Sequence, residues 1–199
     1  SSDLMVADFG KQISTAVIGQ AGENLVPMAC IAHDGRHTRF AGRGGMGALM
    51  GSKMLKAVII KRGEEIKPPM ADEAALDAAI KELLAPMKEK LKMFTTYGTP
   101  GSLPNFERLG NLPINNWRDA RAGDISDKIN GMVMAETIQV KRSGCRKCPL
   151  LCARVVEVKD GPYKTDGISE APEYETLGAF GSLQMVDSLE GIARANELC

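Results

Sequence analysis

The chain has 199 residues, 44% of them apolar, and its 25 Lys and Arg residues balance its 25 Asp and Glu residues. Such a chain is expected to bury a core as one large domain or two small ones. A net charge of zero provides no field to attract nucleic acid or an anionic membrane surface, so neither partner is predicted. No apolar run approaches the ~20 residues of a transmembrane helix, and the N-terminus lacks a signal-peptide pattern. We therefore expect a cytoplasmic protein without a membrane span.

The first sixty residues are expected to form short strands separated by glycine-rich turns. Residues 13–18 are an apolar strand candidate, and residues 56–61 form a second one flanked by lysines. A tight turn is predicted at residues 33–36, where an Asp-Gly pair supplies positive φ. A dense glycine cluster at residues 42–51 lies between this turn and the second strand.

The glycine cluster partly matches a nucleotide-binding loop. Gly42, Gly44 and Gly47 satisfy G-x-G-x-x-G, but residues 38–41 before them make a poor buried parallel strand, so this pattern is weak. A P-loop is excluded because the order at residues 51–53 is Gly-Ser-Lys.

Two interpretations of the glycines remain open. Exposed glycine N–H groups, together with Arg39 and Arg43, would make a cradle for an anionic group such as a phosphate. Close packing of a glycine-rich helix against a sheet explains the glycines about equally well.

Helical periodicity replaces the strand pattern from residue 63 onward. Residues 72–94 are expected to form an amphipathic helix that Pro86 kinks or splits. Met87 and Met93 continue its apolar stripe and are predicted to fill core space. Trp117, in the irregular segment that follows, is predicted to be a packing anchor.

The rest of the chain is expected to alternate short helices with one strand. A helix is predicted at residues 127–138, a strand at residues 154–158, and a final helix from about Ser188. Another helix is expected to begin around residues 169–176, with Pro172 in its first turn. Its two glutamates, Glu173 and Glu175, would be explained by the helix dipole alone.

Cys145, Cys148 and Cys152 form a C-x2-C-x3-C cluster in a chain with only two other cysteines. Such short spacings let one turn aim several thiolates at a single iron or zinc centre. An odd number of cysteines with three crowded together favours a metal site in a reducing compartment over disulfides. Three thiolates do not complete a tetrahedral site, so the fourth ligand is Cys199, Cys30, a non-cysteine group or a residue outside this chain.

Four stretches in order resemble the tungsten-containing aldehyde:ferredoxin oxidoreductase family. They are residues 18–25, residues 41–57, the cysteine cluster, and Pro172-Glu173-Tyr174-Glu175. Together they cover nearly the whole chain from about residue 13, and four ordered motifs are more specific than any one of them.

The resemblance implies an α+β fold that is the middle of a larger subunit. Residues 1–62 would be the C-terminal part of a β-rich, pterin-binding N-terminal domain. Residues 63–199 would be the truncated first part of a mainly helical domain that carries a [4Fe–4S] cysteine cluster.

The resemblance also implies an activity and its cofactors. Members of the family oxidise an aldehyde with water to a carboxylic acid and pass electrons through a [4Fe–4S] cluster to ferredoxin or another iron–sulfur electron-transfer subunit. The metal is tungsten held by two pterins (tungstopterin), whose phosphates share a Mg²⁺ ion.

Site residues follow from the resemblance position by position. Cys145, Cys148 and Cys152 match cluster ligands, whereas Cys199 does not match the fourth ligand, which the family takes from a later domain. Glu175 matches a glutamate near the metal that could take a proton from the attacking water, and Glu173 matches a neighbouring acid. The cofactor-binding candidates include the arginine that contacts a pterin phosphate and the carbonyl that holds Mg²⁺: Arg39, Phe40, Ala41, Gly42, Arg43, Gly44 and Gly45.

One departure from the family concerns the last helix. Some members carry a Glu-x-x-His pair there that binds an iron between subunits, but this chain has Arg194 and Glu197 at those positions. We expect no such iron, which leaves the oligomeric state open. His33 and His37 are interpreted as ordinary loop residues, because neither has a metal-ligand partner at a recognisable spacing.

Two alternatives remain at the level of the sequence. The first keeps the fold and cofactors but acts on an aromatic thioester, as the active-site subunit of a tungsten benzoyl-CoA-type dearomatising reductase. The second is a stand-alone zinc or electron-transfer module that uses the three clustered cysteines and Cys199.

Overall fold

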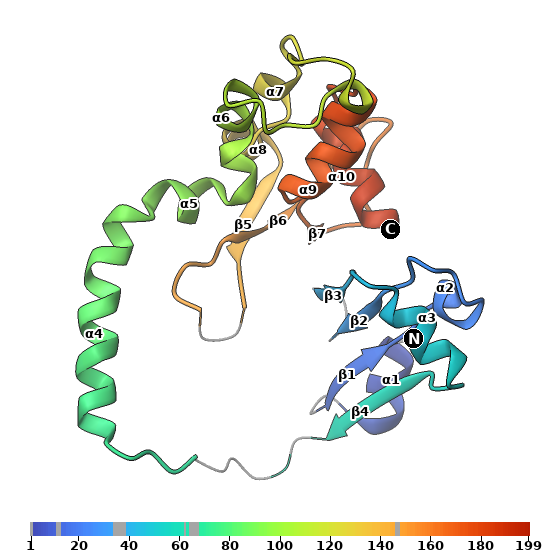
Figure 1. The fold of residues 1–199 in the computed structure, drawn as a ribbon, viewed down its shortest axis with the longest axis vertical. Helices are drawn as coiled ribbons and strands as arrows, with labels where there is room; N and C mark the ends of the chain where they lie inside the picture. Colours follow the sequence, from blue (N-terminus) through green and yellow to red (C-terminus); the bar gives the residue numbers. More distant parts are fainter. Residues whose placement is uncertain (1, 11–12, 34–38, 62, 64–67, 146–147) are drawn as a thin grey trace. The chain divides into compact units, whose positions relative to one another are not determined.

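The computed structural model describes residues 2–10, 13–33, 39–61, 63, 68–145 and 148–199. The chain divides into two compact units, Ser1–Met70 and Ala71–Cys199. Each unit combines helices with a small sheet of its own, so the predicted mixed α and β class is confirmed (Figure 1). The predicted roles of residues 1–62 and 63–199 as pterin-binding and cluster-binding domains stay predictions.

None of the helices in the described ranges is long and apolar enough to cross a membrane.

The first unit is built on a four-stranded antiparallel sheet with the order β3-β2-β1-β4. The predicted strands at residues 13–18 and 56–61 are confirmed as β1 and β4, which pair with each other. Because every pairing is antiparallel, the sheet is not a dinucleotide-binding fold. The predicted turn at residues 33–36 falls mostly outside the described residues. The elements are α1 (Ser2–Phe9), β1 (Ile13–Val17), α2 (Gln20–Glu23), β2 (Ile31–His33), β3 (Arg39–Ala41), α3 (Met46–Ser52) and β4 (Ala57–Lys61).

The second unit begins with the long helix α4 (Glu73–Lys90), followed by α5 (Lys92–Tyr97). The side chain of Asp72 caps α4 by accepting a hydrogen bond from Ala75 N at 2.9 Å. The helix is not split at Pro86, which lies inside α4; it ends at Leu91, and α5 begins at the next residue.

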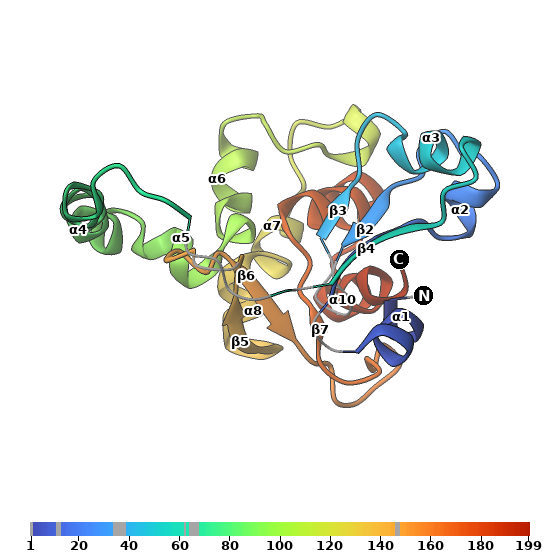
Figure 2. The same ribbon diagram turned by 90° about the horizontal axis from the view of Figure 1, so that it is seen from below.

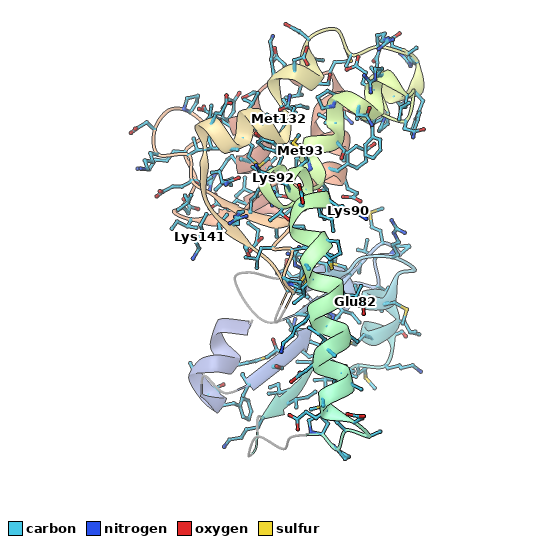
Figure 3. The ribbon with its side chains drawn as sticks, turned by 90° about the vertical axis from the view of Figure 1, so that its left-hand side faces the viewer. Glu82, Lys90, Lys92, Met93, Met132 and Lys141 are labelled. Carbon is cyan, nitrogen blue, oxygen red and sulfur yellow. The ribbon has the colours of Figure 1, made fainter. Side chains whose placement is uncertain are left out.

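The apolar stripe of α4 does not face a core in the described chain. Leu76, Ile80 and Leu83 are exposed, and Met93 on α5 is 64% exposed, so the predicted core-filling role of Met93 is wrong. Figure 3 shows the side chains along this helix, with Glu82 and Lys90 labelled.

Trp117 is also not the predicted packing anchor, because its side chain is 70% exposed. It ends the turn η3 (Asn115–Trp117), in which all three residues have positive φ. Leu112 and Ile114, which precede η3, anchor this segment instead, because they are only 3% and 1% exposed.

The predicted helix at residues 127–138 is two helices, α7 (Ile125–Lys128) and α8 (Gly131–Thr137). Asn130 separates them, since its side chain accepts hydrogen bonds from Met132 N and Val133 N and so begins a new helix.

A three-stranded antiparallel sheet with the order β5-β6-β7 follows. The strands are β5 (Gln139–Ser143), β6 (Ala153–Val156) and β7 (Ser169–Glu170), and all four residues of β6 are buried. The predicted strand at residues 154–158 is thus confirmed, although it begins and ends earlier. Figure 2 shows α8 beside this sheet.

The remaining helices cover the end of the chain. The predicted final helix is confirmed as α10 (Leu189–Leu198), capped by Ser188. Pro172 is not in a first helical turn, because β7 precedes it and α9 begins only at Tyr174. The other elements are η2 (Thr99–Ser102), α6 (Leu103–Arg108), α9 (Tyr174–Thr176), the π-helical turn η4 (Leu177–Gly181) and η5 (Ser182–Gln184).

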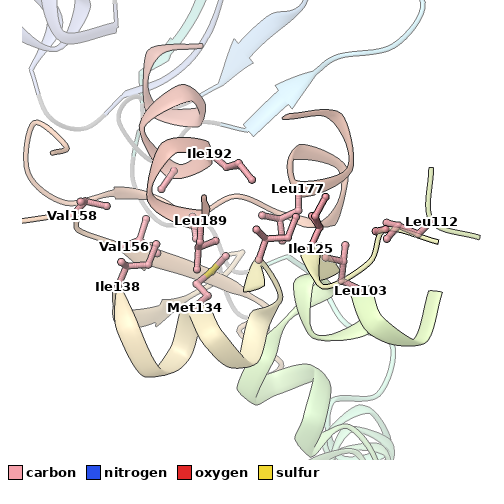
Figure 4. Packing of buried hydrophobic residues seen from close by; sticks show 14 of the residues in the cluster. Leu103, Leu112, Ile125, Met134, Ile138, Val156, Val158, Leu177, Leu189 and Ile192 are labelled. Carbon is pink, nitrogen blue, oxygen red and sulfur yellow. The ribbon is translucent and has the colours of Figure 1, made fainter. Parts of the chain in front are cut away.

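One hydrophobic core holds these elements together. Figure 4 shows Met134 of α8, Val156 of β6, Leu177 of η4 and Ile192 of α10 within it, and each is at most 1% exposed. Burying a side chain of this size contributes roughly 1.5–3 kcal/mol. The core therefore fixes the position of β6, which directly follows the cysteine cluster, and of α9, which carries Glu175.

Candidate functional site

The predicted anion cradle lies in the first unit, where β3 leads into α3. β3 is an edge strand that pairs only with β2, and its residues Arg39 and Phe40 are exposed. The following loop reaches α3 through Gly44 (φ 76°) and Gly45 (φ 65°), two left-handed conformations that favour glycine.

The glycines of this unit divide into two groups. A Cβ at Gly47 would lie 2.4 Å from Cys30 O, and one at Gly51 would lie 1.9 Å from Gly22 O. Gly47 therefore lets α3 pack closely against the segment just before β2, and Gly51 lets it pack closely against α2. A Cβ at Gly42 or Gly44 would meet no described atom within 4 Å. The close-packing interpretation is therefore confirmed for Gly47 and Gly51, while the cradle interpretation stays a prediction for the open positions Gly42 and Gly44.

The open part of the loop suits an anionic group. Gly42, Arg43 and Gly44 are exposed, and Arg43 lies close in sequence to the exposed Arg39. Guanidinium groups beside exposed backbone N–H groups form the donor set that binds phosphate oxygens. The residues present fit a pterin phosphate, and the roles of residues 39–45 stay predictions.

The cysteine cluster lies in the second unit, in the loop that joins the paired strands β5 and β6. Cys148 N donates to Cys145 O at 3.0 Å, and Leu151 has a φ of 48° just before Cys152. Cys145 is exposed, while Cys148 and Cys152 are partly buried. All five cysteines of the chain lie in the described residues and are free thiols.

The thiols of this loop fit an iron–sulfur cluster in number and type, since such clusters are bound by cysteine thiolates. Among the described residues, however, no three His, Cys, Asp or Glu side chains are already gathered in the geometry of a metal site. Cys199, exposed after α10, is therefore not assembled with the other three as a zinc site. The ligand roles of Cys145, Cys148 and Cys152 stay predictions.

Cys152 is the member of the cluster with the most perturbed surroundings. Burial raises the pKa of its thiol, and the nearby negative charge of Glu173 raises that pKa further. Glu173 and Cys152 are thus electrostatic neighbours, although they lie on different elements.

Arg154 is a buried residue of the site that sequence reasoning missed. It is 2% exposed, and its guanidinium donates to the carbonyl oxygens of Cys152 at 2.5 Å and Ala153 at 3.0 Å. It also donates to Phe94 O at 3.2 Å and Thr95 O at 3.1 Å, in the last turn of α5. The available signal was an arginine within the apolar run that follows Cys152.

Glu173 and Tyr174 are held by Thr99, a second residue that sequence reasoning missed. The Thr99 hydroxyl donates to Glu173 Oε2 and accepts from Tyr174 N at 3.1 Å. Thr99 begins η2, so this contact joins η2 to the start of α9. Glu173 is consequently a fixed, partly buried carboxylate.

Glu175 differs from Glu173 in its exposure. It lies in the only turn of α9 and is exposed, while Tyr174 beside it packs edge-on against Phe106 with the ring centroids 5.0 Å apart. Burial and the charge of Glu175 raise the pKa of Tyr174. Glu175 is thus a carboxylate presented by a well-anchored helix, and its catalytic role stays a prediction.

The positions that depart from the family on α10 make an ion pair. Arg194 Nη1 contacts Glu197 Oε2 and also Asp166 Oδ2 at 3.0 Å. The Glu197 carboxylate accepts from Asp166 N at 2.9 Å and 3.1 Å. These side chains fasten the loop before β7 to the end of the helix.

Two family models match the chain. The model described as "Aldehyde ferredoxin oxidoreductase, N-terminal domain" matches residues 1–62, and the model described as "Aldehyde ferredoxin oxidoreductase, domains 2 & 3" matches residues 76–199.

Curated relatives agree with these models. The tungsten-containing aldehyde ferredoxin oxidoreductase of Pyrococcus furiosus is 32% identical over 95% of this chain, and that of Thermococcus kodakarensis is 31% identical over 94%. A P. furiosus protein named "Aliphatic sulfonate oxidoreductase, WOR-like subunit" is 32% identical over 86% of the chain. The chain spans 30% of the length of the first two relatives and 27% of the third.

A solved structure shares the fold. The active site complex BamBC of benzoyl coenzyme A reductase, in complex with 1,5-dienoyl-CoA, superposes with a TM-score of 0.70 over 99% of this chain and 30% of the matched chain, at 19% identity. The family models and curated relatives place the chain in a class of oxidoreductases, and the solved structure shows the same fold. Within that class, the chain belongs to the aldehyde ferredoxin oxidoreductase family.

Proposed function

We propose that the chain is part of a tungstopterin enzyme that oxidises an aldehyde with water to a carboxylic acid and passes the electrons through a [4Fe–4S] cluster to ferredoxin. The single observation that carries this proposal is the family match, which extends over both units. The reaction releases two electrons and two protons from each aldehyde and water. The tungstopterin, when bound, would supply the centre that accepts the electron pair.

The first unit would bind the anionic part of that cofactor. Arg39 and Arg43 would neutralise pterin phosphates, and the open backbone at residues 42–44 would donate N–H groups to their oxygens. The carbonyl of Phe40 would contribute to a Mg²⁺ ion that the phosphates share, since Mg²⁺ prefers oxygen ligands. The exposed edge strand β3 supports these roles because, within the described residues, one side of its backbone has no strand partner.

The second unit would move protons and electrons. Glu175 would take a proton from the water that attacks the aldehyde carbonyl, a task that suits an exposed carboxylate. Glu173, held by Thr99, would be the second acid of the site. Cys145, Cys148 and Cys152 would hold the cluster that carries electrons to ferredoxin or another iron–sulfur subunit.

Cytoplasmic location is part of the same proposal, because all five cysteines are free thiols. Oligomerisation through an iron on α10 is not proposed, since Arg194 and Glu197 are paired with each other.

A second candidate is reduction of an aromatic thioester, which the shared fold of the benzoyl coenzyme A reductase complex favours. The two candidates differ in substrate and in the potential of the electrons, and both would use the same cysteine and arginine residues of this chain.

A dye assay distinguishes the two candidates. The purified, tungsten-loaded holoenzyme is mixed anaerobically with a short aliphatic aldehyde and an oxidised viologen in one arm, and with an aromatic thioester and a reduced viologen in the other. The proposal predicts aldehyde-dependent reduction of the dye and no turnover of the thioester. Dearomatisation of benzoyl-CoA by reduced viologen, with no aldehyde activity, would replace the first candidate by the second.

A further inference from the structure

Arg154 is the buried charge for which the proposed function gives no role. A buried guanidinium is costly unless its donors are satisfied. Here Nη1 and Nη2 donate to the carbonyls of Cys152, Ala153, Phe94 and Thr95. Carbonyls carry no net charge, so these bonds satisfy the donors and leave the positive charge itself in place.

The same bonds fix the end of the cysteine loop. Phe94 and Thr95 lie in the last turn of α5, where a cation is favoured. Phe94 O also accepts from Gly98 N at 2.8 Å. Gly98 completes the contact, because a Cβ there would lie 2.6 Å from Cys152 O and 3.0 Å from the Arg154 guanidinium carbon. Arg154 therefore clamps the Cys152 carbonyl to α5.

Two further observations point from Arg154 toward an anionic group. Its Nε is buried and finds no acceptor in the described part of the chain. Burial lowers the pKa of the guanidinium and so, more weakly, does the charge of Arg142, whereas the charges of Glu173 and Cys152 raise it. Arginine stays protonated at physiological pH, which makes this a permanent cation.

We propose that Arg154 positions the Cys152 loop and raises the reduction potential of the iron–sulfur cluster bound there. Reduction adds one electron to an already anionic cluster and forms or breaks no bond. A fixed cation in a poorly solvated place stabilises the more negative, reduced state. This inference rests on the proposed function, because it needs a cluster at Cys145, Cys148 and Cys152.

The test is a redox titration of the cluster in the anaerobic holoenzyme, followed by electron paramagnetic resonance. R154M removes the charge, and R154K keeps the charge but lacks the planar guanidinium that donates to several carbonyls at once. R142M is the matched control, because Arg142 lies directly opposite Arg154 in the β5–β6 pairing but is exposed.

We expect R154M to disfavour the reduced cluster by about tenfold or more, a negative shift of ~59 mV or more for a one-electron couple. R154K and R142M should stay within about threefold of the wild type, since lysine retains the charge and solvent screens Arg142. Glu173→Gln removes a negative charge and should shift the potential in the opposite direction.

The outcomes separate this inference from the proposed function. A wild-type holoenzyme without iron and sulfide at these cysteines overturns both. A cluster present in R154M at an unchanged potential overturns only the role of Arg154, as does a shift in R142M as large as that in R154M. If R154M retains no cluster, Glu173→Gln decides, and an unchanged potential in that variant contradicts the electrostatic account.

Discussion

Glu107 shows how a single residue can order the second unit without taking part in chemistry. This α6 carboxylate is 7% exposed and accepts hydrogen bonds from Ala122 N at 2.7 Å and from the Ser126 hydroxyl. It joins α6 to the start of α7. No local pattern indicates this role, because both partners lie more than a dozen positions away from Glu107 in the chain.

Glu107→Ala should lower the free energy of unfolding by about 1–3 kcal/mol, because it leaves two buried donors without an acceptor. Urea denaturation measures this change. Glu82→Ala on the exposed face of α4 is the control and should change the free energy by less than about 0.5 kcal/mol. Equal midpoints for the two variants would contradict the structural role of Glu107.

Glu175→Gln tests the proposed proton acceptor at the same scale. The substitution should lower kcat about 100-fold or more, the usual contribution of a general base, while the spectrum of the iron–sulfur cluster stays intact. Glu190→Gln is the matched control, since Glu190 is also an exposed glutamate in the first turn of a helix. A fully active Glu175→Gln enzyme would remove Glu175 from proton transfer.

At the scale of elements, the packing of α2 against α3 depends on glycine. Gly51→Ala would place a Cβ 1.9 Å from Gly22 O, so the two helices would have to separate. We expect a loss of about 1–3 kcal/mol in stability, typical of overpacking. Gly42→Ala meets no described atom within 4 Å and should be nearly neutral. Thermal unfolding of both variants measures the difference, and an equally stable Gly51→Ala protein would show that the contact is not tight.

The elements that could be predicted from the sequence are those with local signals. β1, β4 and α10 were found because an apolar run or a capped amphipathic pattern defines them within a few residues. Three features could not be predicted, because packing and capping decide them: the break at Asn130, the exposure of Trp117, and the continuation of α4 past Pro86.

The candidate site was predictable to a similar degree. Its cysteines, arginines and glutamates stand in recognisable motifs, so their residue types and order could be identified. Arg154 and Thr99 could not, because their partners Phe94 and Glu173 lie 60 and 74 positions away in the sequence. Contacts at such separations come from the fold and leave no local pattern.

At the scale of the whole molecule, the chain provides two kinds of site on two units. The first unit offers an open loop with two arginines. The second offers a cysteine loop whose last cysteine, Cys152, is hydrogen-bonded through its carbonyl to the buried Arg154. The matched relatives are about three times as long as this chain, since it spans 30% of them. The proposed cluster would take its fourth ligand from the complete subunit, and so would the substrate pocket take its remaining residues.

Elemental analysis of the complete natural enzyme, purified anaerobically, tests the central claim most directly. The account predicts tungsten together with pterin, and iron with acid-labile sulfide in the proportion of a [4Fe–4S] cluster. Zinc bound at the cysteines, with neither tungsten nor molybdenum present, would contradict it.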